Sequence, residues 1–229
     1  MSPHPPTTAA SSPDARHLTA QGVERKGQLL EHAARLFAER GYAATRIADI
    51  VKAAGVAKGL FYWYFENKEA VFRELVETTR LSMRQQQAAA IDPAADPLVR
   101  VRQGTEASIV FMGEQRRLYS LFDVETVHTN LREVLQRGSD VHALDTATHI
   151  REGIAAGLIR DDDPMMLAWG VVGTVSSYSH LHRTGRLDWS LDDVARFTGR
   201  FVVHALASSD EVAAAAERQD RDRFLRARA

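Results

Sequence analysis

Apolar residues recur every three or four positions along most of this chain, which is the spacing of one face of an α-helix. The first such stretch covers about residues 23–40, and its apolar face holds Leu29, Leu30, Ala33, Leu36 and Phe37. A glycine follows at position 41. We expect Gly41 to end the helix in the left-handed conformation, with Tyr42 packing back on Phe37.

Capping residues divide the rest of the chain into further helices. Thr45 is a good N-cap for a short helix over 46–54, Gly55 permits a sharp turn, and a third short helix is expected over 58–64. Asn67 would cap a fourth helix, from 68 to about 90. Later starts are marked by Asp96-Pro97, Asp163-Pro164 and Ser190 with Asp193, and predict helices over 97–113, a shorter one through 121, then 125–156, 164–181 and 190–207. No hairpin signal and no internal repeat interrupts this pattern, so the predicted fold is all-α, with about nine helices.

Composition excludes several classes of protein. The 229 residues include no cysteine, which rules out disulfide frameworks, cysteine–zinc sites and thiol nucleophiles, and fits a reducing compartment. The span 164–181 carries no Lys, Arg, Asp or Glu and resembles a membrane helix in that respect, but it holds serines and follows three aspartates. We interpret it as a buried or intersubunit helix, and expect a soluble, cytoplasmic protein.

The most informative stretch runs from Thr45 to Lys68, with the sequence TRIADIVKAAGVAKGLFYWYFENK. Two short helices joined by Ala54-Gly55-Val56 make a helix-turn-helix, which projects the start of its second helix outward, toward a DNA major groove. The alternative is a buried strand, because FYWYF has a high strand propensity. No partner strand is near in the sequence, and the segment fits one short helix, so we favour the helix-turn-helix.

The side chains of the second short helix suit DNA. Lys58 can reach a guanine edge or a phosphate, and Gly59 lets the backbone approach the duplex closely. Tyr62 and Tyr64 carry hydroxyl groups on rigid rings. Arg46 and Lys68 each begin a helix, where the free backbone amides also attract a phosphate.

Local charge supports this interpretation. The chain as a whole is balanced, with 29 basic and 30 acidic residues, but residues 21–65 hold seven basic and four acidic side chains. The near-neutral total therefore combines a basic N-terminal domain with an acidic remainder, as expected when only one domain binds nucleic acid.

The same stretch resembles the signature of the TetR family of bacterial transcriptional regulators, approximately T-x-x-x-x-I-A-x-x-A-G-V-x-x-G-x-x-Y-x-x-F-x-x-K-x-x-L. The resemblance covers about residues 23–76 and departs from the family at Val51, where a small alanine is usual. A weaker similarity to the family lies in residues 157–164. The residues in register are Thr45, Ala54, Gly55, Val56, Gly59, Tyr62, Phe65 and Lys68, with Leu36-Phe37 and Gly41-Tyr42 ahead of them.

The resemblance implies roles for individual residues. Lys58, Gly59, Leu60 and Tyr64 would contact bases, Thr45, Tyr62 and Lys68 would contact phosphates, and Trp63 could face DNA or the fourth helix. Simpler roles stay open: Thr45 only a cap, Gly59 only a helix start and Tyr62 only a packing residue.

The resemblance also implies an all-helical ligand-binding and dimerisation bundle after the helix-turn-helix domain. We expect a disordered arm over 1–20, the DNA-binding domain over 21–67, the bundle over 68–207 and a charged tail over 208–229. The small residues Ala168, Gly170, Gly173, Ser176 and Ser177 and a broad apolar surface on the last long helix support a homodimer through helices 164–182 and 190–207.

The function implied is a homodimeric repressor of a palindromic operator, released by a small apolar or aromatic effector; an activator of the same fold is the alternative. Effector-pocket candidates are Phe111, Met112, Tyr119, Phe122, His128, Trp169 and Tyr178. His142, Asp145 and His149 share one helical face, but the set lacks a fourth metal ligand, and we expect no metal or cofactor. No catalytic motif favours the other alternative, a helical-bundle enzyme.

Overall fold

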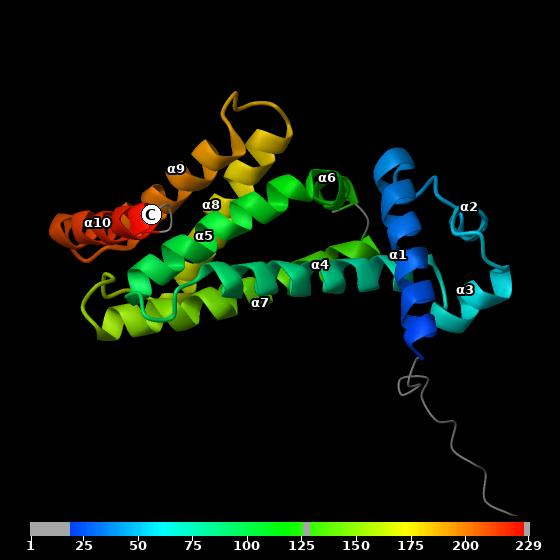
Figure 1. Cartoon of the computed structure of the whole chain (residues 1–229), viewed down its shortest axis with the longest axis horizontal. Helices are drawn as coiled ribbons and strands as arrows, with labels where there is room; N and C mark the ends of the chain where they lie inside the picture. The colour runs from blue at the N-terminus through cyan, green and yellow to red at the C-terminus, as the bar shows by residue number, and fades with distance from the viewer. Residues whose placement is uncertain (1–18, 126–128, 227–229) are drawn as a thin grey trace, which may run out of the picture.

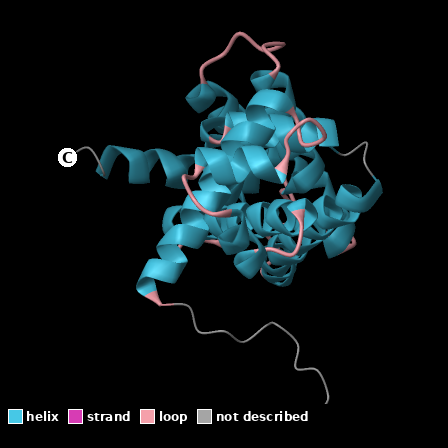
Figure 2. Ribbon diagram, turned by 90° about the vertical axis from the view of Figure 1, so that its right-hand side faces the viewer, coloured by secondary structure: helices cyan, strands magenta, loops and turns pink. Residues whose placement is uncertain are grey.

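The computed structural model describes residues 19–125 and 129–226, with side chains over 19–122 and 132–219. Within these ranges the chain forms ten α-helices and no regular strand (Figures 1 and 2). The helices are α1 Ala20–Arg40, α2 Ile47–Ala53, α3 Lys58–Tyr64, α4 Lys68–Ala90, α5 Pro97–Glu114, α6 Arg116–Glu125, α7 Thr129–Ala155, α8 Pro164–Arg183, α9 Leu191–Leu206 and α10 Asp210–Arg226. The all-α prediction is confirmed, and the additional helix, α10, lies in the expected tail.

The turn after α1 forms largely as the sequence predicts. Gly41 has φ +83°, and its N–H donates to the carbonyl of Phe37 at 2.9 Å. Its ψ of 155° is extended, so the residue does not adopt the left-handed helical conformation that we expected. The ring centroids of Tyr42 and Phe37 lie 5.2 Å apart, which confirms the predicted packing of Tyr42.

The N-cap of α2 differs from the prediction. Arg46 and not Thr45 occupies that position, and its backbone N–H donates to the carboxylate of Asp49 at 3.0 Å. Thr45 is fully buried instead. The other predicted caps are present, because in each case a short polar side chain accepts from a backbone N–H of the first helical turn. These caps are Asn67 for α4, Asp96 for α5, Asp163 for α8 and Ser190 for α9.

The helices assemble around two apolar cores. In Figure 1, α1–α3 form one end of the molecule, and α4 runs from that end into the bundle made by α5 and α7–α9. The first core joins α1–α3 to the first turns of α4 and takes in Leu121 and Phe122 of α6. Full burial of Phe37, Phe61 and Phe72 in it stabilises this end by about 1.5–3 kcal/mol for each ring.

The second core fills the bundle and holds α10 in place. Phe224 and Leu225 are the large apolar residues of the tail, but their side chains lie outside the described residues. The anchors in the structure are Ala213 and Ala216, which are 1% and 3% exposed and belong to the core of the bundle. Alanines on one face let α10 approach the bundle closely.

Candidate DNA-binding surface and effector cavity

The pair α2–α3 is a helix-turn-helix held by its inward side chains. Gly55 in the turn has φ +65°, a conformation that favours glycine, and the N–H of Val56 bonds the carbonyl of Val51 at 3.1 Å. Ile50 from α2 and Phe61 from α3 are completely buried against the first core. The opposite side of α3 is thereby turned to solvent.

Four of the residues expected at the DNA are exposed on α3, namely Lys58, Gly59, Tyr62 and Trp63, and a fifth, Arg46, is exposed at the start of α2. The two rings are 49% and 46% exposed, far more than large aromatic side chains usually are in a monomer. The ammonium of Lys58 lies 5.8 Å from the centre of the Tyr62 ring. Leu60 and Tyr64 are half-buried at the margins of the same surface.

The packing gives no internal reason for a glycine at position 59. Its φ is not positive, and a methyl group added there would meet no other atom within 4 Å. An external partner that approaches the backbone closely would supply the reason.

Thr45 and Lys68, also expected at phosphates, have their polar atoms engaged inside the protein. The Thr45 hydroxyl lies 2.9 Å from the carbonyl oxygen of Gly41 and 3.2 Å from that of Leu36, and donates to them. The Lys68 ammonium donates to the carbonyls of Tyr42 at 2.6 Å and Thr45 at 2.8 Å. Both side chains therefore stabilise the turn between α1 and α2.

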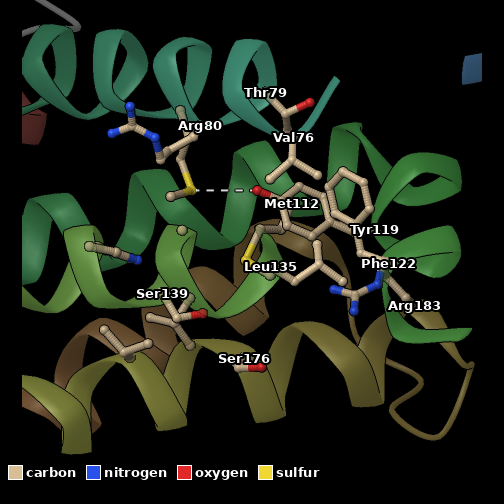
Figure 3. Close-up of a pocket in the computed structure, with 15 residues that line it drawn as sticks. Val76, Thr79, Arg80, Met112, Tyr119, Phe122, Leu135, Ser139, Ser176 and Arg183 are labelled. Atoms are coloured by element: carbon tan, nitrogen blue, oxygen red, sulfur yellow. Dashed lines mark hydrogen bonds between the residues drawn. The ribbon is translucent and has the colours of Figure 1, made fainter. Parts of the chain in front are cut away.

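A cavity of about 190 Å³ lies within the bundle (Figure 3). Five helices contribute to its wall, which is mainly apolar with hydroxyl groups between. Its lining consists of Val76, Thr79, Arg80 and Met83 from α4, Met112 from α5, Tyr119 and Phe122 from α6, Leu135, Gly138, Ser139 and His142 from α7, and Val172, Val175, Ser176 and Arg183 from α8.

Of the seven residues expected at the pocket, Met112, Tyr119 and Phe122 line this cavity. Phe111 is buried behind it, with its ring centre 6.3 Å from that of Tyr119. The pocket prediction is wrong for Trp169 and Tyr178. Both lie on α8 but outside the cavity wall, because Trp169 faces solvent and Tyr178 packs on α9. His128 lies outside the described residues.

One end of the cavity is more polar than the sequence suggested. Arg183 is only 4% exposed, and its guanidinium lies 5.6 Å from the ring centre of Tyr119 (Figure 3). Burial raises the pKa of Tyr119 to about 12, although the nearby Arg183 charge works against the shift. The phenol is therefore neutral at neutral pH, and it donates to the sulfur of Met83 at 3.6 Å (dashed in Figure 3).

The lining residues that sequence reasoning missed come from α4, α7 and α8, four from each helix. On α4, Thr79 and Met83 continue the helical spacing of buried positions past Val76, which still belongs to the first core, and that continuation was the available signal. Nothing in the sequence shows which side of α7 would face α4.

Hydrogen bonds around His142 fix its tautomer. The Ser108 hydroxyl donates to the carbonyl of Gly104 at 2.7 Å, so it can only accept from the Gln87 amide, 2.8 Å away. The same amide nitrogen lies 3.1 Å from Nε2 of His142, which must then be the acceptor. His142 is thus neutral, with its proton on Nδ1, and burial lowers its pKa further.

The face of α7 that holds His142, Asp145 and His149 is occupied by other contacts. The Asp145 carboxylate pairs with Arg84 at 2.8 Å, and Nδ1 of His149 lies 3.4 Å from Arg100. Over the part of the chain that the structure describes, three or more His, Cys, Asp or Glu side chains nowhere gather as a metal site. Among the described helices, none is long and apolar enough to cross a bilayer.

α8 and α9 carry a second exposed apolar surface. On α8 it includes Met166, 69% exposed, and Trp169, followed by Gly170 and Gly173, which have open space around them. On α9 it includes Phe201, 46% exposed, whose ring stacks near Phe197. Ala168, also expected at the dimer contact, lies in the core of its own protomer, and so do Val194, Val202 and Leu206 from the apolar surface of the last long helix, α9.

Comparison with known proteins agrees with this geometry. Residues 29–75 match the family model described as bacterial regulatory proteins, tetR family. The HTH-type transcriptional repressor KstR2 of Mycolicibacterium smegmatis is 30% identical over 156 residues, covering 62% of this chain and 71% of the relative. The HTH-type regulator YhgD of Bacillus subtilis is 29% identical over 149 residues, covering 64% and 78%.

Solved structures share the fold. The ketosteroid transcriptional regulator KstR2 of Mycobacterium tuberculosis superposes with a TM-score of 0.61 at 23% identity, covering 81% of this chain and 96% of that one. SmeT, the repressor of the Stenotrophomonas maltophilia multidrug efflux pump SmeDEF, superposes with a TM-score of 0.68 at 24% identity, covering 82% and 92%. The chain belongs to the tetR family of bacterial regulatory proteins, and it is a DNA-binding transcriptional regulator of the helix-turn-helix type rather than an enzyme.

Proposed function

We propose that this regulator is a homodimeric repressor that acts in the cytoplasm, binds a palindromic operator and is released by a small, mainly apolar or aromatic effector. The observation that carries the proposal is the outward edge of α3, where Lys58, Tyr62 and Trp63 are exposed beside a glycine that the packing does not require. Repression is supported by the names of relatives, since KstR2 and SmeT are both described as repressors.

The outer edge of α3 would read the operator. Lys58 offers a flexible donor for a guanine edge, and Tyr62 presents a hydroxyl group to phosphates and ring carbons to a thymine methyl. Arg46 is exposed at the start of α2, where it would meet the DNA backbone. In this proposal the DNA-binding domain spans 21–67 and the bundle 68–207.

A dimer is proposed because one short helix reads too few base pairs to select a site. Two copies double the contact, and their half-sites would lie about one DNA turn apart. The exposed surface formed by Met166, Trp169, Gly173 and Phe201 on α8 and α9 supports pairing through these helices. The open glycines would allow the helices of two protomers to approach closely.

The effector would occupy the cavity beside α4. Its wall combines large apolar side chains with hydroxyl groups and the cations Arg80 and Arg183, so it suits a mainly apolar molecule with an acceptor near Arg183 or Tyr119. The M. tuberculosis KstR2 protein is described as a ketosteroid regulator, and a ketosteroid is a molecule of this general chemistry. Release requires that the effector bind better to a state in which the two α3 helices no longer match the half-sites.

Selection from a pool of random duplexes tests the proposal. The protein is mixed with the pool at physiological salt, and the bound duplexes are amplified and sequenced over several rounds. We expect enrichment of an inverted repeat with half-site centres about one helical turn apart. An unenriched pool, or a single unrepeated site, would contradict a dimeric operator-binding protein. Reporter transcription from the selected site then separates repression from activation, which remains the alternative function.

A further inference from the structure

Lys68 occupies an unusual place for a cation, the first residue of α4. The start of a helix carries partial positive charge from its free N–H groups, so a lysine there does not stabilise the helix by itself. The helix is capped independently, because Oδ1 of Asn67 accepts from the N–H of Ala70 at 2.8 Å. The lysine must therefore be explained by what its ammonium contacts.

The ammonium faces a set of acceptors in the turn between α1 and α2. It lies 2.6 Å from the carbonyl oxygen of Tyr42, 2.8 Å from that of Thr45 and 3.4 Å from that of Ala43. It also lies 4.2 Å from the centre of the Tyr42 ring, within range of a cation–π interaction. An ammonium group has three protons to donate, and the three carbonyl oxygens and the Tyr42 ring all lie on the side of it that faces the protein.

The acceptors belong to the segment that fixes the position of α2. Thr45 directly precedes Arg46, the N-cap of α2, and its own hydroxyl is tied to the end of α1. The Tyr42 ring is packed between Phe37 of α1 and Phe72 of α4, at centroid distances of 5.2 Å and 5.5 Å. One side chain on α4 thus links α4 to the residues from which α2 and α3 are placed.

We propose that Lys68 is a positioning residue, whose ammonium holds the α1–α2 turn on the first turn of α4 and so sets where Arg46 and α3 meet the duplex. This replaces the expectation that Lys68 contacts a phosphate. The inference rests on the proposed DNA contacts of Arg46 and α3, but the link itself is a property of the protein without DNA.

Three full-length variants separate the two roles. Lys68→Met removes the ammonium and Lys68→Arg keeps the charge in a planar, longer group that does not fit three converging carbonyls. Arg46→Met is the matched control, since Arg46 is exposed and proposed to contact a phosphate. Each is studied by denaturant unfolding without DNA, and by anisotropy on an inverted-repeat duplex of roughly 30 base pairs taken from the selection experiment.

The unfolding measurement tests the link between Lys68 and the α1–α2 turn in the protein alone, so its result does not depend on whether the protein prefers any DNA sequence. We expect Lys68→Met to shift the unfolding equilibrium by roughly tenfold to hundredfold, the effect of losing a charged hydrogen-bond donor. Lys68→Arg should shift it in the same direction by a smaller factor, and Arg46→Met should leave it unchanged. Wild-type stability in both Lys68 variants would overturn the proposal, whether or not the protein prefers any operator.

The binding measurement is made at a temperature where every variant is folded, so that a purely structural role would leave affinity unchanged. We expect Lys68→Met and Lys68→Arg to weaken binding roughly tenfold, the size of a lost base contact, with no change in the slope of log affinity against log salt. Arg46→Met should reduce that slope by about two for a dimer. An equal reduction of slope in Lys68→Met, unchanged affinity in the folded Lys68 variants, or full binding by Lys68→Arg would each overturn the proposal. If Lys68→Met does not fold, the Lys68→Arg result decides.

Discussion

Lys58 and Lys68 are both lysines near the DNA-binding helix, but their ammonium groups have different surroundings. Lys58 extends into solvent from the outer edge of α3, near the ring of Tyr62, whereas the Lys68 ammonium is held by backbone carbonyls of the α1–α2 turn. Residue type and spacing identified both as basic groups near a DNA-binding helix. They could not distinguish the two, because the difference depends on where the carbonyls of a turn 23 to 26 residues earlier fall in space.

His142 allows a prediction at the same scale. His142 lies on α7, and its Nε2 accepts from the amide of Gln87 on α4. Asp145, on the same helix as His142, pairs with Arg84 of α4. Burial lowers the pKa of His142, an effect only partly opposed by the Asp145 charge. The folded protein therefore keeps the ring neutral at a pH where the unfolded chain, with a pKa of about 6.5, takes up a proton.

This difference should make stability depend on pH. The contribution of neutral His142 is complete above about pH 6.5 and is lost as the pH falls from there toward the folded pKa, by at most about 1.4 kcal/mol per pH unit. We expect the free energy of unfolding to fall less between pH 7.5 and pH 5.5 in His142→Gln than in the wild type. The control is His204→Gln, which removes an exposed imidazole of α9 that lies 3.1 Å from the Glu217 carboxylate and should not make the pH profile shallower. Identical pH profiles for the wild type and His142→Gln would show that the ring does not titrate differently on folding.

At the scale of single helices, local sequence signals predicted where helices begin. Which residues line the cavity and hold α10 depends on contacts between helices that are distant in the sequence. Asn67, Asp96, Asp163 and Ser190 cap their helices as expected, because capping involves only neighbouring residues. The cavity wall was predicted only in part, since the α4 and α7 residues enter it through packing between distant segments. The attachment of α10 through alanines was likewise hidden, because small apolar residues give little signal.

The exposed face of α8 is proposed to be part of the dimer interface, and a charge placed on it should break the dimer. Gly173 has open space around it in one protomer, so Gly173→Glu should fold normally but place a charge between closely approaching helices of a dimer. We expect sedimentation velocity to show a shift from dimer to monomer. The control is Gly27→Glu on α1, another helical glycine with nothing within 4 Å, which should sediment as the wild type does. A dimer that survives Gly173→Glu unchanged would place the interface elsewhere.

For the molecule as a whole, α4 connects the two functional regions. Its first residue, Lys68, contacts the α1–α2 turn. Further along it, Met83, Val76 and Thr79 line the cavity, the last two labelled in Figure 3. A molecule that changes the packing of this helix in the cavity thus has a short physical route to α2 and α3. In the proposed homodimer, α4 of each protomer would therefore couple effector binding in the cavity to DNA binding.

The central claim is that two copies of the exposed α3 edge select an operator. Its most direct measurement is fluorescence anisotropy at physiological salt, with the selected inverted-repeat duplex compared with the same duplex after both half-sites are scrambled. The account predicts binding to the inverted repeat that is roughly a thousandfold tighter or more. Equal affinity for the two duplexes would contradict it.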